Sequence, residues 1–288
     1  MFSLPEGIKY YDRGSAGSGR LGAFSRLQPG QALGAFFGYK QVGLFRDAAD
    51  VNASPVQPDA APGRLKFEDV NGDKKIDVND RTFFGNPNPD WTGGLNLAAT
   101  YKGFDLSAFF YTSQGNDVIN YVRFWKDFPQ VWDGAISKDS WYNSARLVNK
   151  SGTPVPLMIP DPLDPTKRII NPDAQVSNPD AKVPVLERSA NFSTTNNFSS
   201  YYMEDGSFVK LKSLILGYNI SSSKLKRFGI EKLRVYVQGV NLFTSTKYTG
   251  LDPELTGSNL NDNTNFGIDF GNYPSNQKGF NFGINLSF

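Results

Sequence analysis

Apolar and polar residues alternate through five segments of this chain, each about ten residues long, which is the period of a β-strand with two unlike faces. Two adjacent segments are separated by Lys102-Gly103, and this arrangement predicts a hairpin with a short turn. In the last segment one face carries large apolar residues and the other carries Asn, Gly and Ser. The five segments are residues 91–101, 104–111, 208–220, 233–243 and 280–288.

The composition predicts an all-β protein without catalytic chemistry based on Cys or His. Aromatic residues make up 14% of the chain and favour strands, while 28 Gly and 18 Pro favour the turns that join them. The absence of Cys and His excludes thiol nucleophiles, imidazole bases, disulfides and zinc sites built on those ligands. A formal net charge of +2 gives no overall attraction to nucleic acid. No apolar run approaches the roughly 20 residues of a membrane-spanning helix, and no secretory signal is expected at the amino terminus.

The organisation of the chain is asymmetric. Residues 1–33 predict an irregular lead-in, and the aromatic stretch Gly34–Phe45 predicts a strand with glycines at its bends. Residues 113–205 show little alternation and are punctuated by prolines, which predicts a long loop region. Short turns at one end of the strands and very long loops at the other are typical of an outer-membrane barrel.

Two all-β architectures fit the alternation. A soluble β-sandwich buries its apolar faces between two sheets, whereas a membrane barrel presents them to lipid. Strands near ten residues match a tilted membrane span of roughly 9 to 11 residues, and the polar faces carry Asn, Gly, Ser and Gln more than Lys and Glu. These features favour the barrel. Burial of Phe282, Ile284 and Leu286 between two layers would contradict it.

Residues 69–80 (DVNGDKKIDVND) place oxygen ligands in the register of an EF-hand-like calcium loop. Lys74 stands where such loops have Gly, and position 12 is an Asp rather than a Glu, as in a dockerin-type loop. The alternative is an Asx-rich surface turn without an ion. The candidate Ca²⁺ ligands are Asp69, Asn71, Asp73, Lys75 through its carbonyl, Asp77 and Asp80.

Four ordered strings resemble the C-terminal part of SusC/RagA-type TonB-dependent outer-membrane transporters of Bacteroidetes. They are DVNGDKKIDVNDRTFFGNPNPDWTGGLNLAATYKGFDLSAFF (69–110), YYMEDGSFVKLKSLILGYNI (201–220), LRVYVQGVNLFTSTKYTGLDPE (233–254) and GIDFGNYPSNQKGFNFGINLSF (267–288). The resemblance covers residues 34–288. It implies a segment of a 22-stranded antiparallel transmembrane β-barrel with long extracellular loops, about seven to nine of its strands, in the cell outer membrane.

The resemblance also implies partners and an activity. Members import glycan or peptide together with a SusD-like lipoprotein over the extracellular mouth, and a TonB complex acts on an N-terminal plug. This sequence shows no plug or TonB box, so we expect a fragment that is not competent alone and that is insoluble without detergent. The alternative function is a secreted, calcium-stabilised carbohydrate-binding β-sandwich module.

Two residue sets carry expected roles. The final aromatic strand resembles the signal that the barrel assembly machinery reads, and its apolar residues also fit a lipid-facing stripe. Aromatic residues in the long loop region are expected either to contact substrate or lipoprotein or to form a small core within the loops. Adjacent Glu204 and Asp205 point to opposite faces of a strand and cannot flank one bond, so no catalytic pair is found. The assembly residues are Phe280, Phe282, Ile284, Leu286 and Phe288, and the loop aromatics are Trp125, Trp132, Trp141 and Tyr142.

Overall fold

A computed structural model describes residues 5–13, 21–129, 136–220, 225, 229–254, 266–271 and 277–288. The chain divides into two units, which are described separately. One comprises Met1–Asn86 and Ile119–Met203, and the other comprises Pro87–Val118 and Glu204–Phe288. The chain passes from one unit to the other between Asn86 and Pro87, within the short strand β9 (Asp117–Asn120) and within the short strand β14 (Met203–Asp205).

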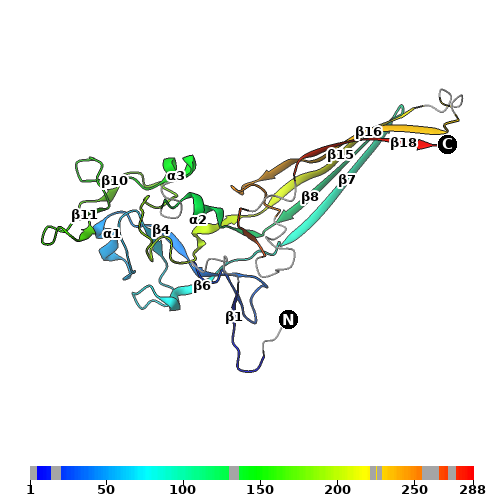
Figure 1. The fold of residues 1–288 in the computed structure, drawn as a ribbon. Coiled ribbons are helices and arrows are strands. Elements are labelled where there is room, and N and C mark those ends of the chain that lie inside the picture. The colour runs from blue at the N-terminus through cyan, green and yellow to red at the C-terminus, as the bar shows by residue number, and fades with distance from the viewer. Residues whose placement is uncertain are drawn as a thin grey trace. The chain divides into compact units, whose positions relative to one another are not determined.

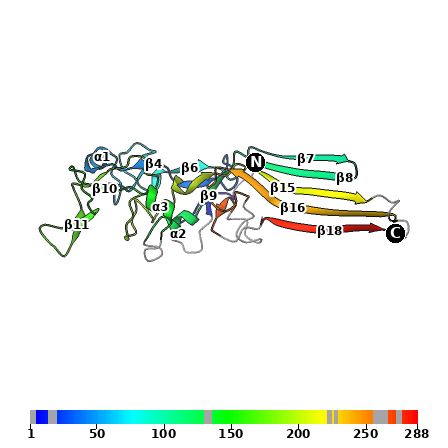
Figure 2. The ribbon, with the colours of Figure 1, turned by 90° about the horizontal axis from the view of Figure 1, so that it is seen from above.

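The second unit is built on one antiparallel sheet of five long strands in the order β18-β16-β15-β8-β7, which lie side by side in both views (Figure 1, Figure 2). Each of the five alternating segments forms one of these strands, so the strand prediction is confirmed. The strands are β7 (Trp91–Tyr101), β8 (Phe104–Gln114), β15 (Phe208–Ile220), β16 (Lys232–Thr246) and β18 (Gly279–Ser287); the unit also contains β17 (Ile268–Asp269).

The predicted hairpin joins β7 to β8. Tyr101 pairs with Phe104, and the two residues between them, Lys102 and Gly103, both have positive φ angles, 47° and 89°. Two consecutive positive angles are the geometry of a type I′ turn, whose twist matches that of the flanking strands. The sheet contains fewer long strands than the seven to nine that the resemblance implies, because the other strands of the described chain are two to five residues long.

Two irregularities change the strand register at one level of the sheet. β15 pairs Leu211 with Phe110 of β8 and Ser213 with Phe109, so Lys212 is an extra residue in β15. β16 gains a further residue relative to β15 at the same level, where Asn241 has a φ of 52°. An extra residue that breaks the pairing pattern is a β-bulge, a feature frequent at barrel rims.

The first unit consists of short strands and helices joined by turns. Its sheets have the orders β1-β2-β3-β6, β4-β5, β10-β13 and β11-β12. The strands are β1 (Tyr11–Arg13), β2 (Ser25–Leu27), β3 (Phe36–Tyr39), β4 (Gln41–Leu44), β5 (Leu65–Phe67), β6 (Arg81–Gly85), β10 (Leu147–Val148), β11 (Met158–Pro160), β12 (Arg168–Ile170) and β13 (Gln175–Val176). The helices are α1 (Ala48–Ala53), α2 (Val122–Lys126), α3 (Lys138–Asn143) and the 3₁₀ turns η1 (Val78–Asp80) and η2 (Ser200–Tyr202).

The aromatic stretch 34–45 forms two strands, β3 and β4, rather than one. Backbone N–H groups at the break bond to a distant segment: Tyr39 N–H donates to Phe198 O at 3.1 Å, and Gln41 N–H donates to Ser200 Oγ at 2.9 Å. β3 then pairs with β2 and β6, while β4 pairs with β5. A tertiary contact therefore ends a strand that the local sequence would continue.

Aromatic rings fill much of the interior of the first unit. Tyr121 stacks on Phe124 with ring centroids 5.1 Å apart and contacts Phe24 at 5.4 Å. Phe198 and Tyr202 stack at 6.4 Å, and Phe24 meets Phe198 edge to face at 4.7 Å. A smaller aliphatic cluster is formed by Ala61, Leu147, Leu157 and Ala174. Large rings provide buried area where short elements supply few aliphatic positions.

Within the described residues, no helix has the length and apolar character needed to cross a membrane.

Candidate functional site

One face of the five-stranded sheet is apolar and exposed. Phe282 is 81% exposed, Ile284 is 65% exposed and Leu286 is 51% exposed, all on β18. A β-sandwich would bury these side chains under a second sheet. Among the described residues no second layer covers them. The other exposed apolar side chains of this face are Trp91, Leu95, Leu97, Tyr101, Phe104, Leu106, Val209, Leu216, Tyr218, Val235, Phe243, Phe280 and Phe288.

The opposite face is polar and carries an ion pair across three strands. Arg234 on β16 donates from Nε and Nη2 to the two carboxylate oxygens of Asp105 on β8, at 2.9 and 2.5 Å. The side chain of Asn219 on β15 donates to the same carboxylate at 3.0 Å. Gly217 lies beneath this pair, and a Cβ there would come within 2.5 Å of Arg234 Nη2. The missing side chain allows the guanidinium to reach across β15 in a two-pronged contact.

Aromatic rings cover glycine backbone elsewhere on the polar face. A Cβ at Gly283 of β18 would come within 2.4 Å of the Tyr236 ring on β16. A Cβ at Gly94 of β7 would lie 3.1 Å from the Phe109 ring on β8. Each ring packs on the strand that lacks a side chain, which compensates for the packing that glycine cannot provide.

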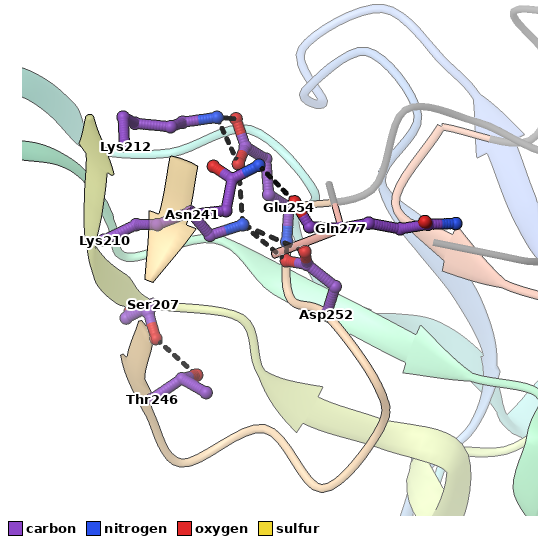
Figure 3. A network of polar contacts seen from close by, with 8 residues as sticks. All are labelled: Ser207, Lys210, Lys212, Asn241, Thr246, Asp252, Glu254 and Gln277. Carbon is purple, nitrogen blue, oxygen red and sulfur yellow. Dashed lines mark hydrogen bonds and ion pairs between the residues drawn. The ribbon is translucent and has the colours of Figure 1, made fainter. Parts of the chain in front are cut away.

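A buried lysine anchors the chain that follows β16 to the polar face of β15, as Figure 3 shows. Lys210 Nζ lies 2.8 Å from Asp252 Oδ1 and 2.8 Å from Glu254 Oε2, and the lysine side chain is only 1% exposed. Lys212, the extra residue of the bulge, lies 2.5 Å from Glu254 Oε1. A buried ammonium is tolerated when carboxylates pair with it, so this contact holds residues 252–254 in place.

Two side chains in the segment that follows β16 have shifted pKa values. Burial alone would raise the pKa of Glu254, but the ammonium groups of Lys210 and Lys212 outweigh burial and hold it below its ordinary value. Burial, with a 2.6 Å hydrogen bond from its hydroxyl to Asp269, raises the pKa of Tyr248 far above its ordinary value. Both groups therefore keep their usual charge at neutral pH, Glu254 as an anion and Tyr248 as a neutral phenol.

The predicted loop aromatics have different environments. Trp125 lies on α2 and meets Phe124 edge to face, with ring centroids 5.2 Å apart. Trp141 and Tyr142 on α3 are 60% and 66% exposed, so their rings are available to another molecule. Trp132 lies outside the described residues.

A buried carboxylate in the first unit was not expected from the sequence. Asp127, which directly follows α2, is 2% exposed and accepts hydrogen bonds from Arg123 Nε at 3.0 Å, from the Tyr201 hydroxyl at 2.7 Å and from the Ser140 hydroxyl. Burial is the main cause that raises the pKa of Tyr201, with Asp127 adding to it. The cluster joins three segments that share no local sequence pattern. The hydrogen bonds within it pair the buried carboxylate with its neighbours, which indicates a structural role.

The loop at residues 69–80 folds through hydrogen bonds between its own carboxylates and backbone. Asp69 accepts from Gly72 N–H at 2.7 Å and from Lys74 N–H at 2.8 Å. Buried Asp80 accepts from Val70 N–H and Asp77 N–H. Within the described ranges no three acidic side chains converge as a metal cage would. Lys74 nevertheless adopts a φ of 64°, the conformation that glycine supplies at this position of EF-hand loops.

Comparison with known proteins finds relatives among TonB-dependent receptors. The chain is 32% identical over 293 residues to TonB-dependent receptor P3 of Formosa agariphila, and the match covers all of this chain and 25% of the receptor. It is 27% identical to TonB-dependent receptor SusC of Bacteroides thetaiotaomicron, covering 90% of this chain and 20% of SusC. The chain belongs to the SusC/RagA-type TonB-dependent receptors. It spans about a quarter of the length of the curated relatives it matches.

Solved structures support the same fold for this receptor segment. The RagAB peptide transporter matches 99% of the chain and 25% of its own chain, with a TM-score of 0.64 and 22% identity. The RagAB peptide importer in the open-open state matches with a TM-score of 0.58 and 20% identity. No family model matches the chain. The recognition made from the four sequence strings is thereby confirmed, while the roles of individual site residues stay predictions.

Proposed function

We propose that this chain forms part of the wall and loops of a 22-stranded outer-membrane barrel that imports nutrients. The observation that carries the proposal is the uncovered apolar face of the five-stranded sheet. Removing one large apolar side chain from water stabilises a protein by about 1.5–3 kcal/mol, so a whole face of them strongly favours contact with hydrocarbon. The opposite face, with Asp105, Arg234 and several amides, suits a wet interior.

The two edges of the sheet support the proposal of a closed barrel. Strands β7 and β18 each pair with one neighbour in the five-stranded sheet. Unpaired backbone groups cost several kcal/mol each in hydrocarbon, so both edges need further strands before the sheet can span a membrane. The remaining barrel strands of the longer receptor would supply them. We accordingly expect the isolated chain to require detergent, and a monodisperse monomer in plain buffer would contradict this.

The proposed partners and cargo follow the family. A SusD-like lipoprotein over the extracellular mouth, a TonB complex acting through a plug, and the barrel assembly machinery at Phe280–Phe288 would serve this receptor. The cargo would be glycan or peptide. The exposed rings of Trp141 and Tyr142 are the described loop aromatics able to touch lipoprotein or cargo. This role requires binding and gated passage and no catalytic residue.

Site-directed labelling tests the orientation of the sheet. The chain has no cysteine, so Phe282→Cys and Asn281→Cys each create a single labelling site on opposite faces of β18. An environment-sensitive fluorophore is attached to each variant, and the labelled chain is kept in mixed micelles of detergent and brominated phospholipid. We expect a blue-shifted emission, quenched by brominated lipid, at position 282 and a water-like emission at position 281. Equal emission at the two sites would overturn the membrane assignment.

Calcium binding at residues 69–80 stays a prediction. The left-handed backbone at Lys74 supports it, because calcium loops of this kind need that sharp turn at their sixth position. The hydrogen bonds from backbone N–H groups to Asp69 and Asp80 also fit the alternative of an Asx-rich turn. If an ion binds, it stiffens the loop.

A further inference from the structure

Aromatic side chains mark both ends of strand β7 on the apolar face of the sheet. Trp91 begins the strand and Tyr101 ends it, and both side chains are exposed. At about 3.3 Å per residue, the path from Trp91 to Tyr101 spans about 33 Å along the strand, or about 25 Å of height at the tilt of a barrel strand. The apolar band of an outer-membrane barrel has this height. Tyr101 therefore lies at the level of the lipid headgroups in the proposed barrel.

An aromatic cluster at this end of the sheet spans three strands. Tyr101 of β7 pairs directly with Phe104 of β8, and the centroid of the Phe104 ring lies 4.6 Å from that of Tyr218 on β15. Tyr218 also lies beside the turn, because a Cβ at Gly103 would come within 3.1 Å of its ring. All three rings are exposed on the apolar face. Each tyrosine combines a ring that suits hydrocarbon with a hydroxyl that can donate a hydrogen bond to phosphate.

The ammonium of Lys102 lies beside this cluster. Lys102 Nζ is 5.2 Å from the centroid of the Tyr101 ring, so the side chain follows the apolar side of the turn. None of the ion pairs within the described part of the chain includes Lys102. Asp105, the acidic residue nearest in sequence, points to the polar face and pairs there with Arg234. The charge of Lys102 is therefore available to an anion from outside the chain.

The backbone of the turn is unfavourable for a lysine. Lys102 has a φ of 47° at the first central position of the type I′ turn, where Asn, Asp and Gly are preferred because they tolerate positive φ angles. An asparagine would keep the turn and relax its backbone, but it would remove the ammonium. Residues held in such a conformation are concentrated at functional sites. The lysine at this position thus agrees with a role for its charge.

Charge complementarity identifies the molecule that fits this site. Short turns of outer-membrane barrels lie on the periplasmic side, where the leaflet presents phosphodiester headgroups. We propose that Lys102, with the hydroxyls of Tyr101 and Tyr218, binds the phosphate of a glycerophospholipid and prefers a headgroup of net negative charge. The acyl chains of that lipid lie along the apolar face. The inference rests on the proposed membrane-spanning function and names a lipid partner of the barrel wall.

Lipid retention measured by native mass spectrometry provides the test. The detergent-solubilised chain is incubated with equal amounts of phosphatidylglycerol, phosphatidylcholine and diacylglycerol that carry the same acyl chains. We expect phosphatidylglycerol to be retained most, phosphatidylcholine less, and diacylglycerol, which has no phosphate, least. Inorganic phosphate should not displace the lipid, because it has no acyl chains to contact the apolar face. Equal retention of the three lipids, or displacement by inorganic phosphate beyond that by sodium chloride of the same ionic strength, would overturn the proposal.

Two variants locate the bound lipid. Lys102→Asn suits the turn and should bind phosphatidylglycerol about fivefold more weakly, which corresponds to about 1 kcal/mol for one lysine near an anionic lipid surface. Lys232→Asn is the matched control, because Lys232 pairs with Ser287 at the same end of the sheet but shares the polar face with Arg234, two residues later. It should bind within about twofold of the parent chain.

The two variants also separate this site from the import function. Unchanged binding to Lys102→Asn, or an equal loss in both variants, would overturn the phosphate site. The labels at positions 281 and 282 report contact of the sheet with lipid independently. If position 282 contacts lipid while Lys102→Asn binds normally, only the phosphate site is wrong and the proposed barrel wall stands.

Discussion

The ring of Tyr236 on β16 covers the backbone of Gly283 on β18 so closely that a Cβ at position 283 would come within 2.4 Å of it. The contact links the last strand to its neighbour on the polar face, in addition to their hydrogen-bonded ladder. It predicts that Gly283→Ala destabilises the sheet by about 1–3 kcal/mol, the range for overpacking a tight contact. Chemical unfolding in detergent measures the change. Gly279→Ala on the same strand is the matched control, because a Cβ there meets nothing within 4 Å. Equal losses in the two variants would contradict the role of the ring.

Removal of the buried ammonium should release the segment that follows β16. Lys210→Met keeps the length of the side chain but removes the charge that Asp252 and Glu254 share. We expect a loss of about 3–5 kcal/mol of unfolding free energy, the range for breaking a buried ion pair, together with faster proteolysis near residue 252. Lys212→Met, at a more exposed position, is the control and should have a smaller effect. The anchor assignment fails if both variants are cut at the rate of the parent chain.

The same anchor predicts a dependence on acid. The pKa of Glu254 is lower in the folded chain than its ordinary value of 4.5, so its contribution to stability is complete above that pH. As the pH falls below 4.5 the unfolded chain takes up the proton first, and the contribution disappears as the pH passes through the lower folded pKa. Thermal unfolding between pH 7 and pH 3 should therefore show a steeper loss for the parent chain than for Glu254→Gln. Parallel curves would rule out this linkage.

An arginine on the apolar face should interfere with insertion. Phe282 lies near the middle of β18, and Phe282→Arg should destabilise the sheet in mixed micelles of detergent and phospholipid by up to about 2–4 kcal/mol, the range for a cation at the bilayer midplane. Asn281→Arg, one residue earlier and on the polar face, should be tolerated. Urea unfolding in the mixed micelles compares the two. A larger loss at position 281 would reverse our assignment of the faces.

Calcium should stabilise the chain if the loop at residues 69–80 binds it. At a concentration one hundred times the dissociation constant, a bound ion adds about 2.7 kcal/mol, which appears as a rise in the unfolding midpoint relative to EGTA. Asp69→Ala should abolish the rise. Asp164 caps a similar turn outside the loop by accepting hydrogen bonds from the backbone N–H and the hydroxyl of Thr166. Asp164→Ala is therefore the control and should leave the rise intact. No response to calcium in the parent chain would favour the Asx-rich turn.

The sequence predicts the long strands well because their signal is local. A period of two marks both the position and the two faces of β7, β8, β15, β16 and β18. The break between β3 and β4 was not predictable, since it depends on hydrogen bonds to residues 198–200, far along the chain. The partners of Lys210 were missed for the same reason, because they lie 42 and 44 residues away. Two lysines within an otherwise apolar strand, followed by an acidic Leu-Asp-Pro-Glu stretch, are the signal that could have indicated them.

Lys212 is an extra residue in β15, so the side chains that point to the apolar face change from even-numbered to odd-numbered positions there. On the C-terminal side of Lys212, the even-numbered residues Leu216 and Tyr218 point to the apolar face. On its N-terminal side, the odd-numbered Val209 points to the same face. Deleting Lys212 would make Leu211 and Ser213 direct neighbours on opposite faces, so Val209 would still point to the apolar side and Lys210 to the polar side. A one-codon deletion at this position should therefore remove the ion pair between Lys212 and Glu254 while leaving both faces of the wall as they are.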